Sequence, residues 1–247
     1  MEFRAPVIVS DAGAWNTFTR LLPNEAVSFR AELATPPEGL ETVELFLGLK
    51  RDPRKLGFQG ENYWIFSSFD HGEMCAGRDD ILRARAPMAY LSFPSLKDPR
   101  ALCHTAEIVA PFSYRALEMF RAEPWRRRGP EYEEAKGRIT EALLDFVEKQ
   151  YPGFRDLVAY AELATPLSFE FFTGAPSGTI YGYPATPDRF RKPWLAPRTT
   201  IPNLYLTGTD AALLGVMGAM MGGVATASLL LGPAGFIEIM RASRSGF

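Results

Sequence analysis

Aromatic and aliphatic residues alternate between Val43 and Phe69, and turn signals such as Asp52-Pro53 interrupt the pattern. A period of two residues is typical of strands that bury one face. This pattern and the later apolar runs predict antiparallel strands at residues 43–49, 63–68, 88–93 and 105–111, and a further strand at residues 157–163. Hairpin-like strands of this kind usually form one sheet, so we expect one here.

A helical period follows between Gly129-Pro130 and Tyr151. Glu131, Glu133 and Glu134 lie in the first turn, where acidic side chains complement the helix dipole, and apolar residues then recur at helical spacing. None of these apolar residues is chemically reactive. We therefore expect an amphipathic helix that packs on the core.

The N-terminal segment has a third pattern. Val7-Ile8-Val9 is a β-branched run that ends at Ser10-Asp11, and a helix is expected at residues 14–22, before Pro23 stops it.

The C-terminal segment predicts a strand, a tight turn and a helix. Residues 203–207 form a short β-type run, Gly208 breaks it, Asp210 lies at the turn, and a glycine-rich run without charge then extends to Glu238. A strand that leads into a helix in this way directs free backbone N–H groups at a bound anion. The turn is a candidate phosphate or flavin site, while a membrane span and a buried core helix are the alternatives for the apolar run.

Composition and charge narrow the function classes. Of the 247 residues, 47% are apolar and 13% aromatic, which is enough to fill the core of one large or two modest domains. A net charge of −2, from 27 basic and 29 acidic side chains without a block of one sign, indicates no nucleic-acid partner.

Cysteine usage and the N-terminus bear on location. Cys75 and Cys103 have no C-x-x-C spacing, which favours a reducing compartment, and the N-terminus does not fit a secretory signal peptide. We expect a cytoplasmic protein, with peripheral membrane contact as an alternative. His71 and Cys75 alone do not make a metal site, so no metal is assigned.

The C-terminal motifs resemble a known signature. An apolar strand, Gly208-Thr209-Asp210 and then Gly215-Val216-Met217-Gly218-Ala219 are similar to the C-terminal flavin-contacting segment of the FAD-dependent oxidoreductases that include phytoene desaturases, carotenoid isomerases and retinol saturases. The motifs Gly178-Thr179-Ile180-Tyr181-Gly182 and Thr186-Pro187-Asp188-Arg189-Phe190 resemble the approach to that signature in the same families.

The resemblance implies a cofactor and its contacts. It implies that FAD is held in part by Gly208, Asp210, Gly215, Val216, Gly218 and Ala219. In these families the matching Asp accepts hydrogen bonds from the ribityl or pyrophosphate region, whereas a purely structural Asp210 would cap the following helix. The chain contains no Gly-x-Gly-x-x-Gly loop in any register, so the dinucleotide half of the site is expected from a separate chain or a missing segment. The expected partner is that separate chain or a second copy in a homo-oligomer.

The expected fold is α/β, with a partial Rossmann-like FAD-binding domain at residues 1–22 and 199–232. A substrate-type domain with an antiparallel sheet is expected at residues 23–198 and a C-terminal tail at residues 233–247. The expected function is that of the C-terminal portion of an FAD-dependent oxidoreductase that desaturates, saturates or isomerises a polyene or other lipophilic substrate. The alternative is a non-catalytic binding subunit or truncated remnant without flavin, and no catalytic residue is assigned.

Overall fold

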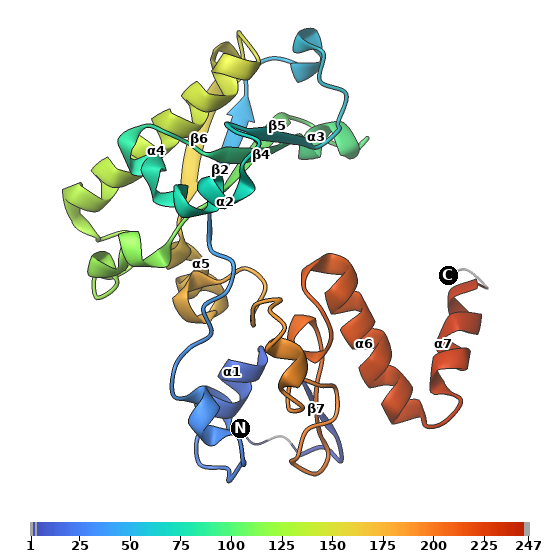
Figure 1. Cartoon of the computed structure of the whole chain (residues 1–247). Coiled ribbons are helices and arrows are strands. Elements are labelled where there is room, and N and C mark those ends of the chain that lie inside the picture. The colour runs from blue at the N-terminus through green and yellow to red at the C-terminus, as the bar shows by residue number, and fades with distance from the viewer. Residues whose placement is uncertain (1, 3, 245–247) are drawn as a thin grey trace. The chain divides into compact units, whose positions relative to one another are not determined.

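The computed structural model describes residue 2 and residues 4–244, which divide into two compact units (Figure 1). The sheet unit is Glu41–Thr173. The terminal unit consists of the chain up to Leu40 together with the chain from Gly174 onward. Each unit has a hydrophobic core of its own.

The sheet unit contains one five-stranded antiparallel sheet. Its strands in spatial order are β3 (Tyr63–Phe66), β4 (Met88–Ser92), β5 (His104–Pro111), β2 (Thr42–Leu49) and β6 (Val158–Ala164). Strand β2 pairs Leu45 with Ile108 of β5 and with Leu163 of β6. The four strands β2 to β5 were predicted to form one sheet, and this is confirmed. β6, predicted as a further strand, belongs to the same sheet.

One face of this sheet is buried and the other is not. Leu45, Leu91 and Ile108 have no exposed surface, and they join Ile139 and Leu143 of helix α4 (Gly129–Gln150) in the core. Figure 1 shows α4 lying along the sheet, as its amphipathic pattern predicts. The opposite face carries exposed aromatic side chains, namely Phe46, Trp64, Phe66 and Tyr160.

Shorter helices complete the sheet unit. The α-helices are α2 (His71–Ala76), α3 (Pro94–Lys97) and α5 (Pro166–Thr173). The 3₁₀ turns are η3 (Pro53–Leu56), η4 (Arg78–Arg83), η5 (Tyr114–Ala116), η6 (Glu118–Phe120) and η7 (Arg155–Leu157).

The terminal unit is built on two strands that lie far apart in sequence. β1 (Ile8–Ser10) pairs in parallel with β7 (Leu204–Leu206), so that Val9 lies opposite Tyr205. The helix expected at residues 14–22 is present as α1 (Ala14–Asn16), which continues as a π-helical segment, η1 (Thr17–Leu21). The parallel pair joins the two segments that the sequence assigned to one domain.

The boundaries of the compact units differ from those expected from the sequence. Residues 23–40 and 174–198 were placed in the substrate-type domain, but both belong to the terminal unit. Phe29 packs edge-on against Phe18 and stacks on Trp194 at 4.7 Å between ring centroids. The remaining turns of the terminal unit are η2 (Arg30–Leu33), η8 (Pro176–Gly178), η9 (Arg189–Arg191) and η10 (Thr209–Ala211).

The charge-free C-terminal run forms two helices. α6 (Gly215–Leu231) ends at Gly232 and α7 (Gly235–Arg244) begins three residues later, so part of the expected tail is helical, while residues 245–247 lie outside the described chain. Gly235 lets α7 approach Ser228 of α6 so closely that a side chain there would overlap the Ser228 carbonyl. Among the described residues, no helix has the length and hydropathy needed to cross a bilayer.

Candidate cofactor site

The turn after β7 depends on glycine. Gly208 has φ of 76° and ψ of −154°, a conformation that L-residues with a side chain rarely adopt. A Cβ at this position would also overlap the Asp11 carboxylate at the end of β1. The parallel strands therefore bring Asp11 and the Gly208 backbone together at one edge of the small sheet.

Asp210 lies in the 3₁₀ turn η10 and connects three segments of the terminal unit. Its side chain is buried, with 3% of the residue exposed. Oδ2 accepts a hydrogen bond from the Ala14 backbone N–H at 2.8 Å, and Oδ1 accepts one from the Tyr183 N–H at 3.0 Å. Gly182 lies so close to the carboxylate that any side chain there would collide with it.

Asp210 is not the N-cap of α6, so the expectation that a structural Asp210 would cap the following helix is wrong. Helix α6 begins five residues later, its N-cap is Leu214, and no side chain bonds to the cap. The carboxylate instead binds two backbone N–H groups from outside the helix. Its structural role is therefore to hold together the β1–α1 turn, the 182–183 segment and the turn after β7.

Arg189 is the charged neighbour of Asp210. Its Nη1 lies 3.8 Å from Asp210 Oδ1 and donates to the Tyr183 carbonyl at 2.7 Å, while Nη2 donates to the carbonyls of Thr209 and Ala212. Burial lowers the pKa of Arg189, and the charge of Asp210 opposes that shift. Buried charges of this kind are tolerated only when they are paired and hydrogen-bonded, as both are here.

The N-terminus of α6 is open. Gly215 has φ of 78° and no atom lies within 4 Å of an ideal Cβ placed on it. Val216 is 86% exposed and Met217 is 67% exposed. Because no side chain caps the helix, its first N–H groups remain available to an oxygen-rich or anionic ligand.

The other helix glycines serve the chain itself. A Cβ on Gly218 would overlap the Leu213 carbonyl, and one on Gly222 would overlap the Gly208 carbonyl, so α6 packs directly on the turn after β7. Thr226 fixes the same contact by donating to the Leu206 carbonyl at 2.7 Å. Ala219 is half-buried on the same helix.

The structure therefore brings the six predicted residues together on one strand, turn and helix. Gly208, Asp210 and Gly218 have evident roles within the chain, whereas Gly215 and Val216 lie at the open helix end. Sequence reasoning missed Ala14, Tyr183 and Arg189. The motif Thr186-Pro187-Asp188-Arg189-Phe190 pointed to this region, but nothing local indicates that its Arg would be buried beside Asp210.

The residues of this region fit a polar, oxygen-rich group such as a flavin nucleotide. Besides the uncapped α6 N-terminus, α1 and residues 179–183 contain buried polar atoms without a hydrogen-bond partner. These atoms are Trp15 Nε1, Asn16 Oδ1, Thr179 Oγ1 and Tyr183 OH. Unsatisfied buried polar atoms are infrequent in folded proteins and call for an explanation such as a ligand or an ordered water.

Comparisons with known proteins agree with the sequence motifs. No family model matches the chain. It is 29% identical over 246 residues to the all-trans-retinol 13,14-reductase of Danio rerio and 30% identical over 241 residues to that of Homo sapiens, alignments that cover 94% and 92% of this chain. It is 27% identical over 190 residues, 73% of the chain, to prolycopene isomerase 1 of an Oncidium hybrid cultivar.

The shared region is only part of each relative. The chain spans 40% of the length of both retinol reductases and 29% of that of the isomerase. The chain is therefore a homologue of the retinol saturases and carotenoid isomerases, and it matches the C-terminal part of that family.

Proposed function

We propose that this chain is the C-terminal portion of an FAD-dependent oxidoreductase that saturates, desaturates or isomerises a polyene or another lipophilic substrate. The observation that carries the proposal is the parallel β1–β7 pair, which leads through the Asp210 turn to the uncapped N-terminus of α6. The names of the relatives, an all-trans-retinol 13,14-reductase and a prolycopene isomerase, support the substrate class.

The residues of the terminal unit have separate roles in this proposal. The N–H groups at the start of α6 hold a phosphate or ribityl oxygen, and Gly215 leaves room for it. Asp210 preserves the shape of the turn through Ala14 and Tyr183, while Arg189 balances its charge. Bound FAD would supply the redox chemistry, and the protein would supply binding and orientation.

The β3–β4 part of the sheet unit offers an aromatic surface for the substrate. Trp64 and Phe66 of β3 stack at 6.4 Å between ring centroids, and Tyr90 of β4 packs edge-on against Trp64 at 5.0 Å. Aromatic side chains on an uncovered sheet face provide a large apolar contact area at little cost in conformational entropy. We assign this face to the lipophilic substrate.

The rest of the cofactor site is proposed to come from residues outside the given sequence. The chain has no Gly-x-Gly-x-x-Gly loop, and Ile8 of β1 and Val216 of α6 expose 58% and 86% of their surfaces. Exposed strands and apolar patches are favoured sites for association. We therefore include in the proposal a separate chain or a further segment that carries the dinucleotide loop. Association with a second copy of this chain is the alternative use of the exposed surfaces, and the proposed location is cytoplasmic with peripheral membrane contact.

Co-expression tests the proposal. The chain is produced with the product of an open reading frame immediately upstream that encodes the Gly-x-Gly-x-x-Gly half, and the purified complex is examined for flavin absorbance and for the flavin-to-protein ratio. A yellow complex that changes the absorbance spectrum of an added polyene is the expected result. A stable but colourless complex would contradict it and favour a binding subunit without flavin.

A further inference from the structure

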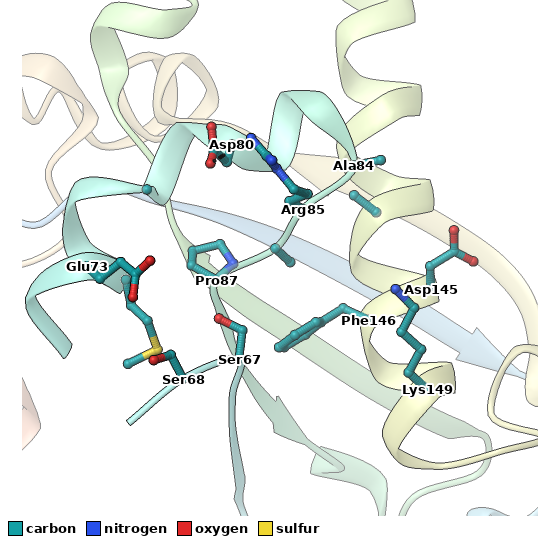
Figure 2. A pocket seen from close by; sticks show the side chains of 14 residues that line it. Ser67, Ser68, Glu73, Asp80, Ala84, Arg85, Pro87, Asp145, Phe146 and Lys149 are labelled. Carbon is teal, nitrogen blue, oxygen red and sulfur yellow. Dashed lines mark hydrogen bonds and ion pairs between the residues drawn. The ribbon is translucent and has the colours of Figure 1, made fainter. Parts of the chain in front are cut away.

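The sheet unit contains a pocket that is unrelated to the proposed cofactor residues. It has a volume of about 610 Å³ and lies between α2, η4, the end of β3 and α4 (Figure 2). Pockets that bind small molecules commonly have volumes of about 300–1,000 Å³. All of its lining residues lie in the Glu41–Thr173 unit, so the pocket belongs to one compact body.

The floor of the pocket is apolar. Met74, Ala86, Pro87 and Ala142 are buried there, and the ring of Phe146 is half-buried beside them. Gly77, Ala84 and Ala142 are among the lining residues. Larger side chains at these positions would fill the space between α2, η4 and α4. A floor of this composition favours an apolar ligand body.

Most charged groups at the rim already have partners. Asp80 forms ion pairs with Arg83 at 3.2 Å and with Arg85 at 3.1 Å. Asp145 forms an ion pair with Arg155 at 2.8 Å. Among the described residues, no ion pair involves the two remaining charged lining residues, Glu73 and Lys149. Figure 2 shows Glu73 and Lys149 on opposite sides of the pocket, with Pro87 and Ser67 between them.

The rim carries charges of both signs, because Asp145 lies beside Lys149 and Asp80 beside Arg85 (Figure 2), but both of these acids already pair with arginines. Arg85 gives only its Nη2 to Asp80, which leaves most of its five N–H donors for another acceptor, and Lys149 adds an exposed ammonium group. Ser67 contributes a hydroxyl group to the lining. Glu73 is the single unpaired acid, and it lies away from Lys149.

We infer that this pocket binds a free amphipathic anion, with its apolar chain on the Phe146 floor and its carboxylate or similar head group beside Lys149. The site does not depend on flavin or on a partner chain. It is separate from the residues to which the cofactor is assigned, and the polyene surface assigned above lies on the uncovered face of the sheet.

Calorimetric titration of the purified chain with decanoate, below its micellar concentration, tests the inference. Saturable binding of one molecule per chain is expected. Lys149→Met keeps the aliphatic stem, removes the charge, and should weaken binding about tenfold, which is the effect of losing one charged hydrogen bond. Lys55→Met is the matched control, because Lys55 is exposed on η3 and does not line the pocket.

Further variants and probes separate the alternatives. Ala142→Leu should fill the pocket and abolish binding, with its melting curve showing that the chain still folds, and Glu73→Gln should strengthen binding. Absence of saturable binding, unchanged affinity of Lys149→Met, or tighter binding of a decyl ammonium cation would each overturn the inference. The chain could instead sediment with phosphatidylserine vesicles in a way that requires Lys149 and that decanoate does not compete away. That result would also overturn the inference and would indicate that Lys149 binds a lipid surface.

Discussion

The Asp210 carboxylate accepts the backbone N–H of Ala14 at 2.8 Å, although 196 positions of sequence separate the two residues. Its other oxygen accepts the N–H of Tyr183. A buried carboxylate that satisfies two backbone donors and lies beside a buried Arg189 fixes the geometry of the turn after β7. The shape of the candidate cofactor site therefore depends on residues at both ends of the chain.

Replacing Asp210 by Asn should destabilise the terminal unit. The Asn amide has one acceptor oxygen, which can accept from only one side. Its NH₂ group would face the other backbone N–H, that of Ala14 or of Tyr183, and leave that donor without an acceptor. An unsatisfied buried donor costs about 1–3 kcal/mol, and Arg189 would also lose its counter-ion. Denaturant unfolding measures the loss.

Asp188→Asn is the control for this change. Asp188 is exposed and pairs with Lys192 at 3.0 Å, a surface contact expected to contribute less than about 1 kcal/mol. If Asp210→Asn lost no more stability than Asp188→Asn, the carboxylate would not hold the three segments together.

The sequence predicts the sheet unit well because its signals are local. The alternation in Leu45, Leu47 and Leu49 identifies β2 and its buried face, and the helical spacing of Ile139 and Leu143 identifies α4. These patterns depend on neighbouring residues only, so they can be recognised without knowledge of the fold.

The terminal unit was less predictable because long-range contacts determine it. Nothing near Phe29 in the sequence indicates that it stacks on Trp194. This contact helps to explain why residues 23–40 belong to the terminal unit and not to the expected substrate-type domain. Asp210 resembles a helix cap in sequence, but α6 begins five residues later and the carboxylate binds Ala14 instead. The flavin contacts of the six residues remain a prediction.

Glu44→Gln should change how stability depends on pH. Partial burial and the like charge of Glu107 raise the pKa of Glu44 above its ordinary value of 4.5. The folded chain therefore retains this proton at a pH where the unfolded chain has released it, and stability falls as pH rises from about 4.5 through the folded-state pKa. The Gln variant lacks this loss.

Urea unfolding at pH 4 and pH 7 provides the measurement. The stability gain of Glu44→Gln over wild type should be larger at pH 7 than at pH 4. In a Glu107→Gln background this pH-dependent gain should be smaller, because the neighbouring charge that raises the pKa of Glu44 is gone. Equal differences between Glu44→Gln and wild type at the two pH values would show that Glu44 titrates normally in the folded chain.

The exposed apolar side of α6 should cause association of the isolated chain. Val216, Met217 and Met220 are exposed on one helix, and contiguous apolar surface of this kind usually marks an interface. The double variant Met217→Lys/Met220→Lys should bind less apolar dye and sediment as a smaller species. Met119→Lys, at an equally exposed methionine of the sheet unit, should change neither measurement. A wild-type chain that stays monomeric at high concentration without binding dye would argue against an interface on α6.

Gly215→Ala should weaken flavin retention in the assembled enzyme through the open end of α6. Gly232 is the matched control because it ends the same helix with φ of 88°, compared with 78° at Gly215, and neither glycine has an atom within 4 Å of an ideal Cβ. Both Ala variants should lose about 1–3 kcal/mol of stability, because a residue with a side chain rarely adopts a positive φ. Only Gly215→Ala places its Cβ where the cofactor is expected, so the flavin-to-protein ratio should fall for that variant alone. Equal flavin content in the two variants, at equal melting temperatures, would remove the α6 N-terminus from the cofactor site and leave its glycine as a requirement of the backbone.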